Sequence, residues 1–326
     1  MSRRMLRRTL ARLLLAAPTL PLLGCNLYES SCGPAGEGSG QPSKGNQTFR
    51  IAEIQLADGG TPAPGASCEE LCVAVAPQDN PPGPCSLQNG DGGTPEMVTC
   101  TVTFLCEGRR PEGLLSDGSV DGRVSALGAL FASMAHLEAA SVPAFERLAR
   151  ELEAQGAPAR LVRAARRAAA DEVRHARAMG TLAERHGAPV PAVEVEPFQP
   201  RSLERLALEN AVEGCVRETF GALLAGWQAR CAGDARVRQS LAHIAPDELR
   251  HAELSWEIDA WVLSRLDEAA RRRIHEARRE ALRTLQREVE ESVEQEELVR
   301  LAGLPSREDA RKLVQGLSEW VISAEA

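Results

Sequence analysis

The stretch DEVRHA at residues 171–176 recurs as DELRHA at residues 247–252. Both copies lie in segments where apolar residues return every three or four positions, which is the period of an amphipathic helix. In each copy the glutamate and the histidine fall on the apolar stripe. A carboxylate and an imidazole that point into a core are costly unless a charged group meets them there. The repeat therefore predicts two equivalent helices with a charged interior, to which each contributes a Glu-x-x-His pair: Glu172 with His175, and Glu248 with His251.

A single glutamate occupies the apolar face of the helix that precedes each copy. Glu138 comes 34 residues before Glu172, and Glu213 comes 35 residues before Glu248. The chain is therefore interpreted as a duplicated helical hairpin. The four helices are expected at about 122–154, 159–186, 203–231 and 235–266.

These helices would bring four glutamates and two histidines into one core. Bridging carboxylates with one imidazole per ion are the ligands that a pair of divalent metal ions requires. The pattern over residues 124–266 resembles the ferritin-like di-iron carboxylate superfamily. That resemblance implies a mainly α fold, a ferritin-like four-helix bundle, and two iron ions or manganese as cofactors. The implied ligands are Glu138, Glu172, His175, Glu213, Glu248 and His251. The alternative is a bundle that keeps these residues as buried salt bridges.

The two motifs also resemble the DExRH form of bacterial di-iron monooxygenases and ribonucleotide reductase small subunits. This resemblance implies that Asp171 and Asp247 each hold the histidine of the opposite copy and fix its tautomer. The segment EGCVRETF is similar to the third helix of tRNA-modifying hydroxylases, where the first glutamate is the ligand. This similarity favours Glu213, rather than Glu209 or Glu218, as the metal ligand of the third helix. The remaining histidines are expected not to bind metal: His136, His186, His243 and His275.

The N-terminus, MSRRMLRRTLARLLLAAPTLPLLGC, is similar to a bacterial lipoprotein signal peptide. The resemblance implies that residues 1–24 are removed and that Cys25 is lipidated. The protein would then be anchored to a membrane in the cell envelope, facing the periplasm or the cell surface. An uncleaved anchor is the alternative, but the apolar stretch is short and broken by prolines. The paired arginines also resemble, less closely, a twin-arginine export signal.

A flexible tether (25–46) and a cysteine-rich module (47–117) are expected next, with strands near 48–56 and 97–105. Six cysteines in an exported module predict three disulfides. A zinc or rubredoxin-like site is the alternative, although the spacings do not form two CxxC pairs. The six are Cys32, Cys68, Cys72, Cys85, Cys100 and Cys106, whereas Cys215 and Cys231 are expected to be buried thiols of the helical region.

The four-helix bundle is expected over 118–266 and further helices over 267–326, where a largely solvated fifth helix (267–301) precedes a short sixth that opens near Ser306. The net charge of -8 and a pI of about 5.5 give no indication of nucleic-acid binding.

Composition also narrows the chemistry. The only tyrosine, Tyr28, lies outside the bundle, which disfavours a ribonucleotide reductase subunit with a tyrosyl radical. The cysteine spacing disfavours a rubrerythrin, and an N-terminal anchor disfavours a ferritin cage. The leading hypothesis is a membrane-tethered di-metal oxidoreductase that reacts with oxygen or peroxide, with a small-molecule oxidant as its partner and no protein partner indicated. The alternative is a non-enzymatic metal-binding or structural lipoprotein, because this bundle hosts many functions.

Overall fold

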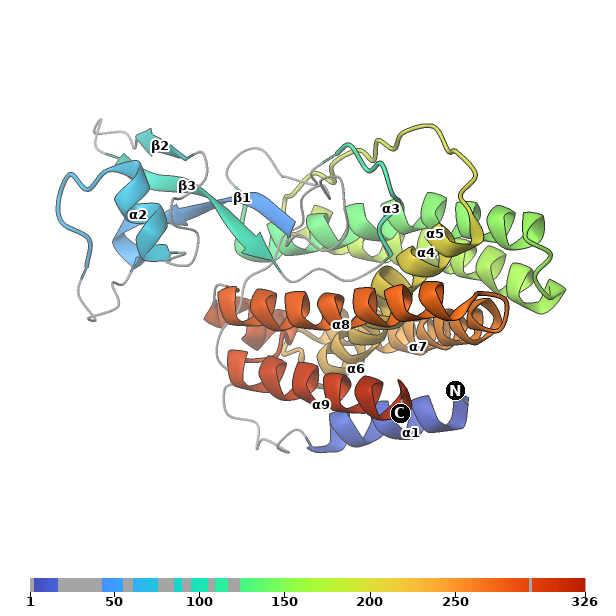
Figure 1. The fold of residues 1–326 in the computed structure, drawn as a ribbon. Helices are drawn as coiled ribbons and strands as arrows, with labels where there is room; N and C mark the ends of the chain where they lie inside the picture. The colour runs from blue at the N-terminus through green and yellow to red at the C-terminus, as the bar shows by residue number, and fades with distance from the viewer. Residues whose placement is uncertain are drawn as a thin grey trace.

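The computed structural model describes residues 3–16, 43–54, 61–75, 85–89, 95–104, 109–116, 124–292 and 295–325. The described chain is mainly helical. A small module of short strands projects from one end of a larger helical domain, which is formed by residues 124–325 and an N-terminal helix (Figure 1).

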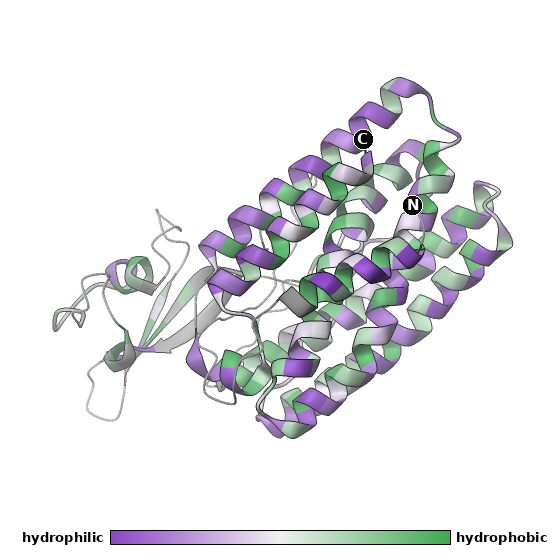
Figure 2. Cartoon of the chain, turned by 90° about the horizontal axis from the view of Figure 1, so that it is seen from below, coloured by the Kyte–Doolittle hydropathy of each residue, from purple (hydrophilic) through white to green (hydrophobic). Residues whose placement is uncertain are grey.

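The helical domain is built on four long helical segments that agree closely with those expected from the sequence. Helix α3 (Ala126–Ala154) packs along α4 (Ala159–Arg185), and α4 packs on α7 (Ala235–Leu263), which in turn packs on the third segment. Ser125 caps α3 by accepting a hydrogen bond from the Gly128 N–H, and Asp234 caps α7 in the same way. The long helices seen in Figure 2 carry both hydrophilic and hydrophobic residues, as expected of helices that are partly buried.

The third segment is continuous, but its geometry changes twice. It begins as the α-helix α5 (Leu203–Glu209), becomes the π-helix η2 (Asn210–Glu218) and ends as the α-helix α6 (Thr219–Cys231). The π-helix lies close to α7 because Gly214 has no side chain. A Cβ at Gly214 would lie 2.7 Å from Oγ of Ser255.

The C-terminal helices cover the third segment. Helix α8 (Glu268–Glu291) packs against η2 and against α9 (Arg307–Glu325). Along the chain, a short π-turn, η3 (Leu298–Ala302), separates α8 from α9. The expectation of a largely solvated fifth helix over 267–301 is wrong on both points. The helix ends at Glu291, and it buries a complete face that includes Ile274, Leu282, Leu285 and Glu288.

The N-terminal helix α1 (Arg3–Ala16) lies against α6 and α9 (Figure 1). Leu6 and Leu10 are buried in the apolar cluster of those helices, and Arg7 forms an ion pair with Glu253 of α7. Among the described residues, no helix has the length and apolar character needed to cross a membrane. Cys25 and most of the expected tether lie outside the described residues.

The cysteine-rich module is a three-stranded antiparallel sheet with a helix against it. The strand order is β1 (Ser43–Arg50), β3 (Pro95–Phe104) and β2 (Ser86–Asn89). Strand β1 starts inside the expected tether and ends earlier than expected, because the 3₁₀ turn η1 (Ile51–Glu53) follows it.

Two disulfides hold helix α2 (Cys68–Val75) to the strands of the module. Cys68 is bonded to Cys85, and Cys72 is bonded to Cys100. The described cysteines of the module are therefore disulfide-bonded, as expected. Cys32 and Cys106 lie outside the described residues. In the helical region Cys215 is buried, as expected, whereas Cys231 is only half-buried.

Candidate metal centre

The two copies of the repeated motif face one another across the seam between α4 and α7. Nδ1 of His175 lies 3.0 Å from Oε1 of Glu248, and Nδ1 of His251 lies 3.0 Å from Oε1 of Glu172. Within each copy the histidine is 3.6 or 3.7 Å from its own glutamate. The four side chains are thus arranged with near two-fold symmetry, and none is more than 4% exposed.

Two further glutamates complete the cluster, one from each remaining helix. From α3, Glu138 places Oε2 3.6 Å from Nδ1 of His175. From the end of the π-helix, Glu218 places Oε2 3.9 Å from Nδ1 of His251. Two sets result, each with its ligand atoms within 4.8 Å of one another, and they share Glu248. The first candidate set is Glu138, Glu172, His175 and Glu248; the second candidate set is Glu218, Glu248 and His251.

Glu213, the ligand expected from the third helix, does not lie in either set. Its Oε2 accepts a hydrogen bond from the backbone N–H of Arg110 at 3.3 Å, and its Oε1 lies 4.0 Å from Nε of Arg217. The π-helix is the physical cause of the difference. Because it pairs residue i with i+5 and winds more slowly than an α-helix, it rotates the residues that follow it, and Glu218 reaches the cluster instead.

One sequence signal for Glu218 was available. At helical spacing it lies on a stripe of small residues, where a helix can approach its neighbours closely, whereas Glu213 lies on a stripe of large apolar residues. Because α1 and α9 pack on α6 in addition to α7, large apolar residues are buried on nearly every face of α6 and do not identify the face that lies toward the cluster. The stripe around Glu218 comprises Ala211, Gly214, Cys215, Ala222 and Ala225.

The third candidate of this helix, Glu209, is fully engaged elsewhere. Both of its carboxylate oxygens accept hydrogen bonds of 2.9 Å from the guanidinium of Arg109. Burial raises the pKa of Glu209, but the charge of Arg109 outweighs that effect and the net pKa is lowered. Glu209 is therefore an ionised partner of an arginine, and it is not among the residues that face the cluster.

The aspartates of the two motifs lie against the histidines of the opposite copies. Nε2 of His175 is 3.3 Å from Oδ2 of Asp247, and Nε2 of His251 is 3.4 Å from Oδ2 of Asp171. A carboxylate only accepts hydrogen bonds, so this contact requires the proton on Nε2. In the neutral imidazole, the form that binds a metal ion, Nδ1 then carries the lone pair, and in both histidines this atom is directed to the cluster.

Two arginines hold those aspartates in place. Nη2 of Arg174 lies 2.7 Å from Asp171 and 2.9 Å from Asp247, and Nη2 of Arg250 lies 3.1 and 2.6 Å from the same two carboxylates. Burial raises the pKa of Asp171, but His251 and Arg174 outweigh it and keep the net pKa well below its usual range. The aspartate is therefore a permanent acceptor for the imidazole N–H.

The cluster leaves an unusual number of buried polar atoms without hydrogen bonds. Buried polar groups in proteins are otherwise almost always paired, because an unpaired one costs about 1–3 kcal/mol. Seven of the unpaired buried atoms in the described chain lie together in this cluster, and all seven are of types that coordinate metal ions. They are both carboxylate oxygens of Glu172 and of Glu218, Oε1 of Glu248, and Nδ1 of His175 and of His251.

The pKa values of several groups in this cluster are shifted toward the protonated form. Burial raises the pKa of Glu138 and of Glu218, and the neighbouring carboxylates Glu172 and Glu248 raise them further. Burial lowers the pKa of both histidines, but the surrounding glutamates outweigh it, so the net pKa of His175 and His251 is raised. Protons therefore compete with a cation for these groups.

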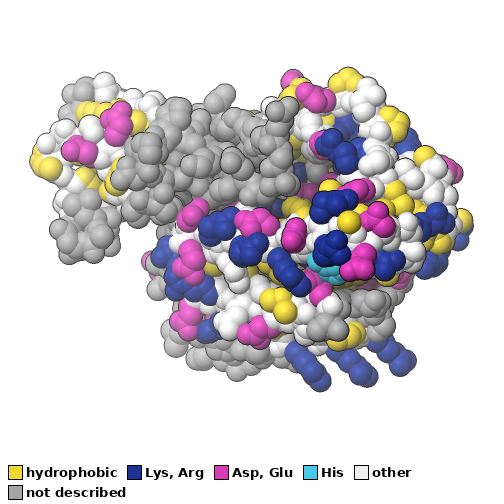
Figure 3. Space-filling model, in the orientation of Figure 1, with side chains coloured by type: hydrophobic (Ala, Val, Ile, Leu, Met, Phe, Trp, Pro, Cys, Tyr) yellow, Lys and Arg dark blue, Asp and Glu magenta, His cyan; other side chains and the backbone are white. Residues whose placement is uncertain are grey.

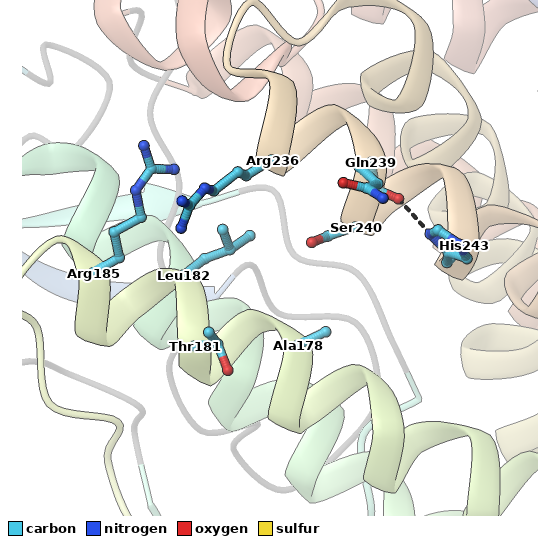
Figure 4. A pocket seen from close by; sticks show the side chains of 8 residues that line it. All are labelled: Ala178, Thr181, Leu182, Arg185, Arg236, Gln239, Ser240 and His243. Atoms are coloured by element: carbon cyan, nitrogen blue, oxygen red, sulfur yellow. Dashed lines mark hydrogen bonds between the residues drawn. The ribbon is translucent and has the colours of Figure 1, made fainter.

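The histidines expected to be non-ligands all lie outside the cluster. His243 lines a hollow of about 470 Å³ between α4 and α7, together with Arg185 and Arg236, and its Nδ1 lies 2.7 Å from the backbone oxygen of Gln239 (Figure 4). The other three histidines contact neighbouring residues: His136 contacts Ser116 and Pro191, His186 contacts the ring of Phe131, and His275 contacts Glu325.

On the face shown in Figure 3, basic and acidic side chains alternate over the helical domain.

Comparison with known proteins finds no family model, no curated protein and no solved structure that matches this chain. What the cluster can do follows from its own residues. Four carboxylates balance the charge of two divalent cations, and two imidazoles provide one nitrogen for each. Such a set of buried carboxylates and imidazoles could hold metal ions.

Proposed function

We propose that this protein binds two transition-metal ions, preferably iron, in a ferritin-like arrangement between α3, α4, α7 and the third helical segment. The observation that supports this most is the set of buried carboxylate oxygens and imidazole nitrogens that face one another without hydrogen bonds. A salt-bridge network, the alternative, would account for the two 3.0 Å contacts of the imidazoles with Glu172 and Glu248, but it leaves both oxygens of the buried Glu218 without a hydrogen bond. The proposed ligands are Glu138, Glu172, His175, Glu218, Glu248 and His251.

We further propose that the metal-loaded protein is an oxidoreductase that reacts with oxygen or peroxide. Iron in such a site supplies the electrons for the reduction of these oxidants. The chain itself supplies a buried site, because none of the six proposed ligands is more than 7% exposed, and this burial favours an oxidant that is a small molecule. The aspartates Asp171 and Asp247 orient the two imidazoles.

The same burial also supports a second candidate function, metal binding without turnover. A closed centre can hold its ions as a store or as a structural element. Under either function we propose that the chain is exported and anchored through a lipid on Cys25. The two disulfides support an oxidising compartment, since such bonds are rare in the cytosol.

Loading the full-length protein with ferrous iron under anaerobic conditions tests the proposal. We expect two irons per chain, and we expect Glu172→Ala to lower that number sharply while His243→Ala leaves it unchanged. Oxygen consumption in proportion to bound iron would support the oxidoreductase, and two oxygen-inert irons would support the second candidate. A folded wild-type chain that retains no metal would refute both.

A further inference from the structure

Arg109 connects the cysteine-rich module to the third helical segment. It lies in the linker 109–116, its exposure is 0%, and its guanidinium lies over the ring of Phe145 at 5.5 Å. Its Nε and Nη2 donate to the two oxygens of Glu209, the last residue of α5, at 2.9 Å each. Nη2 also donates to Oδ1 of Asn210, the first residue of the π-helix, at 3.1 Å. Arg109 therefore donates hydrogen bonds to the last residue of the α-helix and to the first residue of the π-helix, where one becomes the other.

The contact continues from Asn210 to the helix that carries the second motif. Nδ2 of Asn210 donates to the backbone oxygen of Ser255 at 2.9 Å, and Oγ of Ser255 donates to the backbone oxygen of His251 at 3.1 Å. Gly214 permits this close approach of η2 to α7. An unbroken chain of hydrogen bonds thus runs from the linker to a histidine of the cluster.

The linker is also fixed to the helix that carries Glu138. Oγ of Ser141, one turn further along α3, donates to the backbone oxygen of Arg109 at 3.0 Å. The ring of Phe145, under the Arg109 guanidinium, lies 5.1 Å from the ring of His251. Arg109 therefore bridges two helices that supply residues to the cluster, although it lies outside all four.

The π-helix needs such support, because π-helices are rare and short and are often found at functional sites. Its far end is held by a second buried pair, in which Arg217 donates to both oxygens of Glu288 at 3.0 and 2.7 Å. Buried ion pairs seldom add net stability, because removing both charges from water is costly. Two such pairs at the two ends of one π-helix point to a role in fixing its geometry.

We propose that Arg109 is a positioning residue of the metal centre, which fixes the start of the π-helix through Glu209 and Asn210 and so aims Glu218 at His251. This inference rests on the proposed function. It means that the second candidate set is assembled only when the linker of the cysteine-rich module is in place. The first candidate set, which contains no residue of the π-helix, does not depend on Arg109.

Manganese(II) binding to the full-length Arg109→Gln variant tests the proposal. We expect the wild type to bind two manganese ions per chain with a spin-coupled electron paramagnetic resonance spectrum. The variant should bind one ion and give the six-line spectrum of isolated manganese. Glu151→Gln is the matched control: the buried Glu151 accepts an equivalent bidentate pair of hydrogen bonds from Arg201, at 2.8 and 2.7 Å, and it belongs to neither the Arg109 contacts nor the cluster. This control should keep both ions and the coupled spectrum.

Two coupled ions in Arg109→Gln would overturn the proposal while leaving the proposed function intact. A wild type that binds no manganese and no iron would refute the proposed function itself. If circular dichroism shows that Arg109→Gln does not fold, Glu209→Gln gives the same test, because it removes the negative charge of the carboxylate that pairs with Arg109. Loss of one ion in Glu209→Gln would support the proposal, and retention of two coupled ions would overturn it.

Discussion

His175 and Asp247 belong to different copies of the repeat, 72 residues apart, and Nε2 of the histidine lies 3.3 Å from Oδ2 of the aspartate. His251 and Asp171 repeat the relationship at 3.4 Å. Each motif therefore supplies the acceptor for the histidine of the other motif. The two imidazoles are fixed only when both helices are packed together, so the cluster depends on the tertiary fold.

Replacing Asp247 by alanine should weaken metal binding without removing a proposed ligand. The proton of His175 would no longer be held on Nε2, and loss of such a contact typically lowers metal affinity about 10- to 100-fold. Competition with a chelator of known affinity measures the change. Asp267→Ala is the control, since Asp267 caps α8 far from the seam. Equal affinities of Asp247→Ala and the wild type would argue against the role of this contact.

Glu218→Ala and Glu213→Ala form a matched pair within the same π-helix. We expect Glu218→Ala to lose one of two metal ions, because it removes a member of the second candidate set. Glu213→Ala should keep both, because Glu213 contacts Arg110 and Arg217 instead. Metal analysis of the two purified variants decides the point, and the opposite result would restore Glu213 as the ligand.

Metal affinity should rise with pH. The pKa values of Glu138, Glu218, His175 and His251 are raised, so protons compete with a cation for these groups. Lowering the pH therefore opposes binding, and raising it favours binding until the groups are deprotonated. Calorimetric titration with manganese in buffers of different ionisation enthalpy should show net proton release at neutral pH. Binding that is independent of both pH and buffer would contradict this protonation pattern.

The disulfides are open to direct measurement. Mass analysis without reductant should show at least the four missing hydrogens of Cys68–Cys85 and Cys72–Cys100, and six if Cys32 and Cys106 form the expected third bond. The thiols Cys215 and Cys231 should become alkylatable on unfolding. Zinc in the purified module with all its thiols reduced would exclude the disulfides.

The proposed membrane anchor depends on one cysteine. In cells fed a labelled fatty acid, the wild type should carry the label and Cys25→Ala should not, because the thiol is the proposed site of acylation. Processing at Cys25 would also release α1, whose Leu6 and Leu10 lie in the apolar cluster of α6 and α9. Equal labelling of both proteins would remove the basis for a lipid anchor at this position.

The sequence alone determined most of the helices and five of the six residues that the structure brings together. Helical periodicity fixes which face a residue occupies, so the repeated Glu-x-x-His pairs and Glu138 had to share a core once α3, α4 and α7 packed together. The spacing within each motif also placed the aspartate beside the glutamate, ready for the opposite histidine. These features follow from local geometry that every α-helix shares.

Only the tertiary structure decided that Glu218 and not Glu213 faces the cluster. The periodicity of an α-helix does not reveal a π-helix, and α6 is buried on nearly every side because α7, α9 and α1 pack against it. The same applies to Arg109, which lies in a linker without any periodic pattern and enters the helical domain through contacts with residues about 100 positions away. Such long-range contacts form only when the whole chain has folded, because they depend on the packing of segments that are distant in sequence.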